Sequence, residues 1–284
     1  MKIGLYGINV GLCADPAVAT SVAKVAEEAG FESLWTAEHV VLPDPQVPPS
    51  PLPARTPLLD PAVALSHLAA HTRTIRLATG IIILPQRNPV VLAKELASVD
   101  VLSGGRLIFG LGAGYLEPEF EAIGASFSDR GERTNEYIEA ILALWTQDAP
   151  RFQGRFVSFG GIDARPRPVQ QPHPPIVVGG TSPPALRRAL RHGNGWYGFA
   201  LDLEATEQCV ERLREVEKQV ERPSELGPIE ISVTPALALD ADTARRFEDL
   251  GVGRLIPLAL ARSAEDLIAL VEETADALLG RAGI

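Results

Sequence analysis

Glu38 and His39 follow a short apolar run at residues 33–37, which we interpret as a strand. An imidazole titrates near neutral pH and a nearby carboxylate favours its charged form, so this pair could move a proton to or from a substrate. The structural alternative is a loop histidine that is hydrogen-bonded to the backbone. We predict Glu38 and His39 as catalytic residues.

A glycine-rich loop at residues 179–183 could hold a phosphate group. It reads Gly-Gly-Thr-Ser-Pro and leads from an apolar run into a helical pattern. Glycines bring backbone N–H groups close to an oxyanion, Thr181 and Ser182 add hydroxyls, and a helix N-terminus adds positive potential. Arg187 and Arg188 follow one turn later. The loop is predicted as a phosphate site, although a mere tight turn would carry the same residues.

Glycines also interrupt two other apolar runs. Gly80 lies inside the predicted strand at residues 75–84, where a glycine indicates a bulge, a packing kink or close approach of the backbone to a ligand. Gly110, Gly112 and Gly114 occupy the end of the next apolar run and the turn after it. Because they follow a predicted strand, we include Gly112 and Gly114 among candidate contacts to a ligand.

The remaining histidines and cysteines do not indicate a metal centre. His67 and His71 lie four residues apart on a predicted helix, but no third ligand or flanking glutamate accompanies them, which favours surface residues. Cys13 and Cys209 are far apart in apolar or helical patterns, so we expect two reduced thiols and neither a disulfide framework nor a zinc site. No metal is predicted.

These candidate residues must be positioned by an alternation of strands and helices. Strands are expected at 3–8, 33–37, 75–84, 106–111, 176–178, 195–200, 229–235 and 254–260. Helices are expected at 16–29, 60–71, 89–102, 131–145, 183–192, 203–220, 243–250 and 263–279, several of them opened by Asp-Pro or Asn-Pro and ended by glycine.

Eight consecutive strand–helix units predict an α/β fold, a (β/α)8 TIM barrel, since parallel crossovers need helices and closure removes exposed edges. An open doubly wound sheet is the alternative. Residues 7–11 lack the third glycine of a dinucleotide fingerprint, which argues against it. We expect one TIM-barrel domain over residues 1–284, with its active site at the C-terminal strand ends. Two interruptions are expected: a proline-rich loop at about 40–59 and an insertion with a small hairpin at about 146–175.

Composition narrows the classes of partner. The chain has 284 residues, 46% hydrophobic and 22% charged, and a formal net charge of −10. This acidic balance disfavours nucleic acid and anionic membrane surfaces as main partners. No stretch approaches about 18 uninterrupted apolar residues, and the first residues lack a cleavage motif, so we expect a cytoplasmic protein.

Several segments together resemble the bacterial luciferase-like monooxygenase superfamily, and within it the oxidoreductases that use the deazaflavin coenzyme F420. The matching segments are GFESLWTAEHVVLP (30–43), TRTIRLATGIIILPQRNPVVLAKELASVDVLSGGRLIFGLGAGYLEPEFEAIG (72–124), RGERTNEYIEAILALW (130–145) and PPIVVGGTSPPALRRALRHGNGW (174–196). They span most of residues 1–200. The resemblance implies a TIM barrel, a homodimer and an F420 cofactor, with FMN as the alternative.

The resemblance also implies roles for individual residues. Glu38 and His39 would lie by the deazaflavin ring, with His39 as acid, base or electrostatic partner. Gly80 and Ile81 would form a bulge, often with a non-proline cis peptide, that supports one face of the ring. The cofactor-binding residues would be Gly80, Ile81, Gly112, Gly114, Gly179, Gly180 and Thr181, the last three at the phosphate.

One position departs from the resemblance. The sugar-phosphate dehydrogenases of the superfamily carry a catalytic glutamate after the glycines of the fourth strand, where this chain has Tyr115. Glu117 and Glu119 are not at the matched position. Tyr115 is retained as a third catalytic candidate that could donate a hydrogen bond or stack on a substrate.

Three functional hypotheses follow. The leading one is an F420-dependent oxidoreductase that transfers a hydride between the cofactor and a small organic substrate. The nearest alternative is an FMN-dependent monooxygenase of the same superfamily. The third is a barrel that binds a flavin-like ligand without catalysis, which the tyrosine in place of a catalytic acid makes conceivable.

Overall fold

The parallel strands of the chain pair side by side until the last returns to the first. The computed structural model describes residues 1–280. Within them the ring runs in the order β1 (Lys2–Tyr6), β2 (Ser33–Trp35), β3 (Arg76–Ala78), β5 (Leu107–Gly112), β8 (Ile176–Gly179), β9 (Gly195–Leu201), β10 (Glu230–Pro235) and β11 (Arg254–Leu255), and β11 pairs with β1. All these pairings are parallel. The predicted TIM barrel is confirmed.

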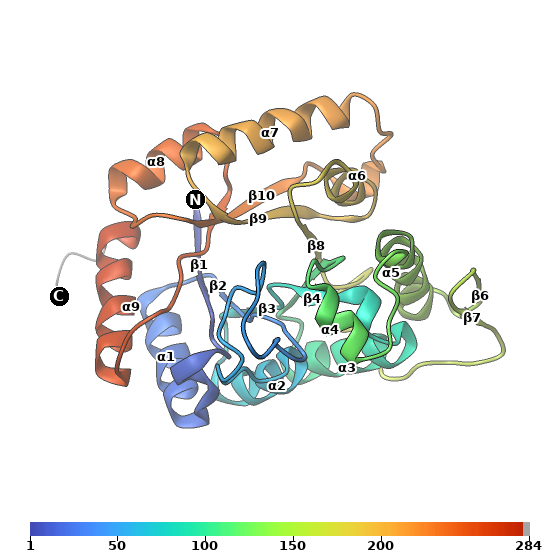
Figure 1. The fold of residues 1–284 in the computed structure, drawn as a ribbon, viewed down its shortest axis with the longest axis horizontal. Coiled ribbons are helices and arrows are strands. Elements are labelled where there is room, and N and C mark those ends of the chain that lie inside the picture. The colour runs from blue at the N-terminus through green and yellow to red at the C-terminus, as the bar shows by residue number, and fades with distance from the viewer. Residues whose placement is uncertain (281–284) are drawn as a thin grey trace.

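Helices cover the outside of this barrel (Figure 1). They are α1 (Pro16–Ala29), α2 (Pro61–His71), α3 (Pro89–Leu102), α5 (Arg130–Thr146), α6 (Pro183–His192), α7 (Leu203–Glu217), α8 (Ala241–Asp249) and α9 (Ala264–Leu279). Short 3-10 turns lie at η1 (Gly11–Ala14), η2 (Leu84–Gln86) and η3 (Ser224–Leu226). None of the helices in the described residues is long and apolar enough to cross a membrane.

The helix starts follow the capping residues that the sequence presents. Asp15 accepts hydrogen bonds from the backbone of the first turn of α1, and Asn88 does the same for α3. In both helices proline occupies the first position, where the missing N–H costs nothing. Gly30 ends α1 with a φ of 93°, a left-handed conformation that glycine adopts readily. These local signals therefore set the boundaries correctly.

The third barrel strand is broken where a continuous strand was predicted at 75–84. It consists of β3 and of β4 (Ile82–Ile83), and the peptide bond between Gly80 and Ile81 is cis. At the break, the Thr79 hydroxyl forms hydrogen bonds with the backbone of β5, as the backbone of a continuous strand would. It donates to the carbonyl oxygen of Gly110 at 2.7 Å and accepts from the Gly110 N–H at 2.8 Å.

Other boundaries differ from expectation as well. The last strand, expected at 254–260, is reduced to β11, because Pro257 has no N–H to continue the ladder. A short helix that was not predicted, α4 (Glu117–Ala122), follows β5. Within residues 146–175, β6 (Phe152–Gln153) and β7 (Ser158–Phe159) form an antiparallel pair.

Two apolar cores hold the structure. The larger lies between the strands and the surrounding helices. The smaller fills the inside of the barrel and consists of Trp35, Ala78, Ile108, Val177, Tyr197 and Ile256. At the N-terminal end of the strands, buried Arg254 donates to both carboxylate oxygens of Glu32 at 2.9 Å. The barrel interior is therefore packed, and a ligand would approach from the other end.

Candidate functional site

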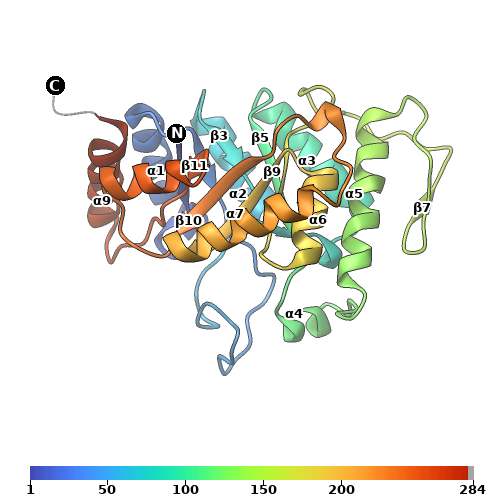
Figure 2. The same ribbon diagram turned by 90° about the horizontal axis from the view of Figure 1, so that it is seen from above.

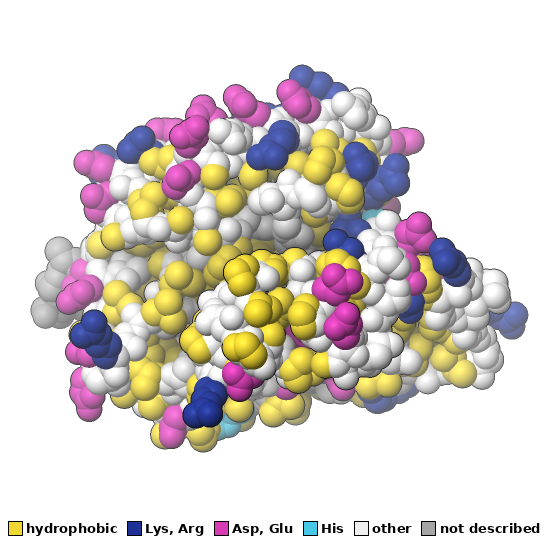
Figure 3. Space-filling view, in the orientation of Figure 1, with side chains coloured by type: hydrophobic (Ala, Val, Ile, Leu, Met, Phe, Trp, Pro, Cys, Tyr) yellow, Lys and Arg dark blue, Asp and Glu magenta, His cyan; other side chains and the backbone are white. Residues whose placement is uncertain are grey.

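The C-terminal ends of the strands carry the candidate residues. His39 follows β2, Ile81 follows β3, Gly112 ends β5 and Gly179 ends β8. The loop 40–59, which contains neither helix nor strand, projects from the barrel on the same side as α4 (Figure 2). Hydrophobic side chains gather over this loop on the face shown in Figure 3, in agreement with the half-exposed Val40, Val41 and Val47.

Asn9 fixes the chain just before His39. Its buried side chain accepts a hydrogen bond from the Ala37 N–H at 2.8 Å and donates to the carbonyl oxygens of Ala37 at 2.9 Å and Leu59 at 2.6 Å. A buried amide that meets three backbone groups ties β2 to the far end of loop 40–59. Asn9 was not among the predicted site residues, although it directly follows the first apolar run.

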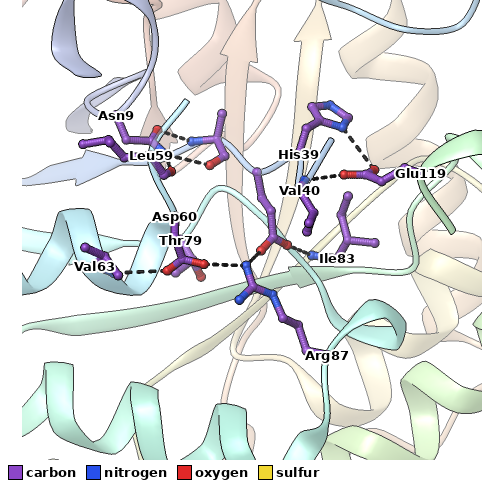
Figure 4. A network of polar contacts seen from close by, with 12 residues as sticks. Asn9, His39, Val40, Leu59, Asp60, Val63, Thr79, Ile83, Arg87 and Glu119 are labelled. Atoms are coloured by element: carbon purple, nitrogen blue, oxygen red, sulfur yellow. Dashed lines mark hydrogen bonds and ion pairs between the residues drawn. The ribbon is translucent and has the colours of Figure 1, made fainter. Parts of the chain in front are cut away.

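The partner of His39 is Glu119 of α4 (Figure 4). Nδ1 of His39 lies 3.2 Å from Oε2 of Glu119, and the other carboxylate oxygen accepts the backbone N–H of Val40. The Glu119 side chain is 0% exposed and that of His39 is 8% exposed. The imidazole is thus held from one side by the buried carboxylate of Glu119, which was not among the predicted site residues.

Glu38 does not pair with His39, which corrects the expectation of an adjacent acid/base pair. Its buried carboxylate accepts hydrogen bonds from the Ile83 N–H and from Arg87, which also donates to Asp60 at 2.7 Å. Neighbouring residues of an extended segment point to opposite sides, so Glu38 faces the barrel wall while His39 faces α4. Glu38 therefore has a structural partner, and its predicted catalytic role has no contact to His39 to support it.

Arg87 balances the charge of that buried carboxylate. Burial disfavours the charged guanidinium, but the Glu38 and Asp60 carboxylates outweigh it and hold the pKa of Arg87 above its ordinary value. A pocket of about 290 Å³ adjoins these residues and His39. The ion pairs form the wall of this pocket behind His39.

Replacing Arg87 by alanine is expected to lower the free energy of unfolding by about 3 kcal/mol, because it leaves the Glu38 carboxylate buried without its cation. Urea denaturation measures the change. Adding Glu38→Gln should recover part of the loss, since the uncompensated charge is then removed. Arg73→Ala, at an exposed arginine, is the matched control and should change little. Equal losses in both alanine variants would contradict the assignment.

Tyr115 lies on the open side of His39. Its hydroxyl is 3.5 Å from Nε2 of His39, and the two rings meet edge to face with centroids 6.0 Å apart. Burial and the charge of Glu119 raise the pKa of Tyr115, so the phenol keeps its proton at neutral pH and can donate a hydrogen bond. The residue is 49% exposed, which leaves it accessible to a ligand.

Aromatic side chains line the barrel end beside these residues. The rings of Tyr6 and Phe199 have centroids 5.1 Å apart, and Phe199 is 45% exposed although it lies in β9. Burial and the nearby Tyr115 raise the pKa of Tyr6, so it too is a neutral phenol. Sequence reasoning missed both residues. The sequence feature that could have indicated these two residues is their position near the C-terminal end of a strand.

The glycines at the ends of β5 and β8 make room for one side chain. A Cβ atom on Gly112 would lie 2.3 Å from Cδ1 of Ile81, and one on Gly179 would lie 2.5 Å from the same atom. The side chain of Ile81 therefore occupies the space beside Gly112 and Gly179, at the ends of β5 and β8. Gly112 and Gly179 were predicted as cofactor contacts, and the structure gives them this packing role.

Gly114 has a similar role toward α4. With a φ of 78°, it adopts a conformation that other residues rarely adopt, and a Cβ atom there would lie 2.6 Å from Ile83 and 2.9 Å from the Phe120 ring. The close approach lets α4 pack on the end of β4. Since Glu119 lies on that helix, Gly114 positions the partner of His39, whereas a cofactor contact was predicted.

The loop at 179–182 keeps some of its predicted features and loses one. Gly180 has a φ of 112°, and Thr181 and Ser182 are exposed with their hydroxyls at the start of α6. Arg188, however, points away and is buried against α5, where it donates to Asn135 at 2.7 Å and to a backbone carbonyl. It is not available to a phosphate in this loop, while Arg187 of the same turn is exposed.

No group of three potential metal ligands occurs among residues 1–280. Nε2 of His67 lies 2.9 Å from the Thr20 hydroxyl, and Nδ1 of His71 is hydrogen-bonded to the His67 carbonyl oxygen. Cys13 and Cys209 are buried free thiols. The two histidines are thus explained by their hydrogen bonds and the two cysteines by their burial.

Comparison with known proteins identifies the family of this chain. The sequence profile of the luciferase-like monooxygenases matches residues 7–272. The chain belongs to the luciferase-like monooxygenase family. A relative in the family, the uncharacterized protein Rv0953c of Mycobacterium tuberculosis, is 33% identical over 264 residues, which cover 90% of this chain and 92% of that protein.

Relatives and structures with stated activities differ in cofactor. An FMNH(2)-dependent dimethylsulfone monooxygenase of Pseudomonas putida is 33% identical over 157 residues, covering 54% of this chain and 43% of that protein. The structure of an F420-dependent secondary alcohol dehydrogenase has a TM-score of 0.80 at 15% identity, with 99% of both chains covered. Monooxygenase RslO1 of Streptomyces bottropensis has a TM-score of 0.77 at 24% identity, with both chains fully covered. At these identities the structural likeness shows the fold.

Proposed function

We propose that this member of the family is an F420-dependent oxidoreductase that transfers a hydride between the cofactor and a small organic substrate. The observation that carries the proposal is the imidazole of His39, whose Nδ1 faces a buried carboxylate at 3.2 Å and whose Nε2 faces the exposed Tyr115. That arrangement suits proton transfer to or from a substrate oxygen. The fold likeness to an F420-dependent secondary alcohol dehydrogenase supports the choice of cofactor.

The residues at the barrel end fit a planar ring that carries a phosphate-bearing tail. Ile81 offers an apolar floor, which the absence of side chains at Gly112 and Gly179 leaves room to form. The exposed hydroxyls of Thr181 and Ser182 and the positive end of α6 would hold the phosphate. When bound, the deazaflavin supplies the ring carbon that accepts or donates the hydride.

The protein contributes the proton and the orientation. In carbonyl reduction His39 would supply a proton to the substrate oxygen, and in alcohol oxidation it would remove one. Tyr115 would donate a hydrogen bond to the same oxygen, because its hydroxyl already lies beside the open side of His39. Val40 and the aromatic residues Tyr6 and Phe199 would exclude water from the reacting atoms.

The runner-up is an FMN-dependent monooxygenase, which the sequence likeness to the FMNH(2)-dependent relative favours. Titration of the purified protein with F420 and, separately, with FMN distinguishes the two through the change in cofactor absorbance and fluorescence. We expect saturable binding of F420. Binding of FMN with no saturable binding of F420 would replace the leading proposal by the runner-up.

The phosphate loop gives this titration a matched pair of variants. Gly180→Ala should weaken F420 binding at least tenfold, because its φ of 112° strains any other residue and the new Cβ would lie 3.1 Å from Ala185. Gly160→Ala, in the exposed hairpin segment, should leave the affinity unchanged. Turnover of any carbonyl, imine or enone by the bound complex would reject a barrel that only binds its ligand.

A further inference from the structure

The carboxylate of Glu119 contacts two groups that differ in whether they can accept a hydrogen bond. One carboxylate oxygen accepts the backbone N–H of Val40, which can only donate, and the other faces Nδ1 of His39 at 3.2 Å. Within the described residues, no other charged side chain forms a hydrogen bond or ion pair with the imidazole. Glu119 is thus its one charged hydrogen-bond partner there.

We infer that Glu119 is a positioning residue that keeps the proton of neutral His39 on Nδ1 and leaves Nε2 as a hydrogen-bond acceptor toward the barrel end. An ionised carboxylate accepts hydrogen bonds only, so it requires a donor at Nδ1. The catalytic meaning of this arrangement rests on the proposed function, whereas the tautomer itself does not.

Tyr115 agrees with the same assignment. Its hydroxyl lies 3.5 Å from Nε2 and can donate a hydrogen bond, which an unprotonated Nε2 would accept. The distance is long for a hydrogen bond, and a substrate hydroxyl that reaches Nε2 more closely would displace the phenol. His39 is then ready to act as a base without rearrangement.

Glu119 lies on helix α4, 80 residues along the chain from His39. The packing of this helix against the rest of the site holds the carboxylate beside the imidazole. Phe120 packs against Gly114 and has its ring centroid 5.3 Å from that of Phe127. The neighbours Glu117 and Glu121 are exposed. Of the three glutamates in this helix, Glu119 is the buried one that meets the site.

The substitution Glu119→Gln makes a sharp test. The N–H of Val40 still requires an acceptor, so the amide oxygen must take that position and the NH2 group must face Nδ1. The amide then donates to Nδ1, and the proton of neutral His39 moves to Nε2. A one-atom change of nearly equal size therefore converts the acceptor at the barrel end into a donor.

Nitrogen-15 NMR of the imidazole nitrogens reads the tautomer directly, above the pH at which the ring protonates, and needs no cofactor. The resonances of His39 are identified by their loss in His39→Gln. We expect Nδ1–H in the wild-type protein and in Glu117→Gln, the matched control on the same helix, but Nε2–H in Glu119→Gln. The wild-type spectrum alone decides if Glu119→Gln does not fold, since Nε2–H there would overturn the inference.

Turnover supplies the second measurement once a substrate is in hand. Glu119→Gln should lower kcat for substrate oxidation by on the order of 10²-fold or more with F420 affinity unchanged, because the base is lost while the binding surface remains. An unchanged kcat would overturn the positioning role. Failure of the wild type to bind F420, with Nδ1–H still observed, would reject the proposed function and leave the tautomer standing.

Discussion

Replacing His39 with alanine is expected to lower kcat by about 10²- to 10⁴-fold, the usual contribution of a positioned acid or base. The reaction would lose its proton donor or acceptor, while Ile81 and the loop at 179–182 would still hold the cofactor. Steady-state kinetics with F420 and a turned-over substrate measures the loss, and a cofactor titration of the same variant shows whether binding survives.

His71→Ala is the control for this experiment. His71 is exposed at the end of α2, and its ring is hydrogen-bonded to the His67 carbonyl oxygen of the same helix, so its removal should leave kcat unchanged. Addition of imidazole should restore part of the activity of His39→Ala by entering the space left by the ring. Retained turnover in His39→Ala would remove the chemical role of this residue and with it the main support for the proposed function.

Gly110→Ala is expected to lower the free energy of unfolding by about 3 kcal/mol or more, the upper end of overpacking effects. A Cβ atom at this position would lie 1.9 Å from the carbonyl oxygen of Thr79, a backbone atom held in place by the pairing of β3 with β5. Backbone in the middle of the barrel cannot move aside. Urea denaturation measures the effect.

Gly112→Ala should behave differently, because the new atom meets the end of the Ile81 side chain at 2.3 Å. We expect a loss of about 1–3 kcal/mol, most of it recovered by Ile81→Val, which removes the clashing methyl group. The same second substitution should not rescue Gly110→Ala. Recovery in both double variants, or in neither, would contradict the view that these two glycines make room for different neighbours.

The order of elements was predictable because its signals are local. Asp15-Pro16 and Asn88-Pro89 open helices, Gly30 closes one, and apolar runs alternate with helical patterns until eight units are counted. Each signal involves residues within a turn or two of each other. Closure of a barrel then follows from the number of units, since a parallel strand needs a crossover and a closed sheet leaves no edge.

The contents of the site were predictable only in part. His39 and Tyr115 contact each other, and the Gly80–Ile81 break follows β3 at the C-terminal ends of the strands, where strand-end positions predict chemistry. The role given to Glu38 was wrong in its partner, because adjacency in sequence places two side chains on opposite sides of an extended segment. Arg188 was misplaced for a related reason, since the face of α6 on which it lies packs on α5.

Residue patterns were enough to predict the family, the barrel and the strand ends at which chemistry would lie. The contact of Glu119 with His39 across 80 residues of chain, and the place of Ile81 beside Gly112 and Gly179, depend on the folded barrel. Ring closure brings these residues together, and neither local propensity nor periodicity records which side chains meet across it. Glu119, which lies in a helix that the sequence did not predict, is thus the buried partner of the candidate catalytic base.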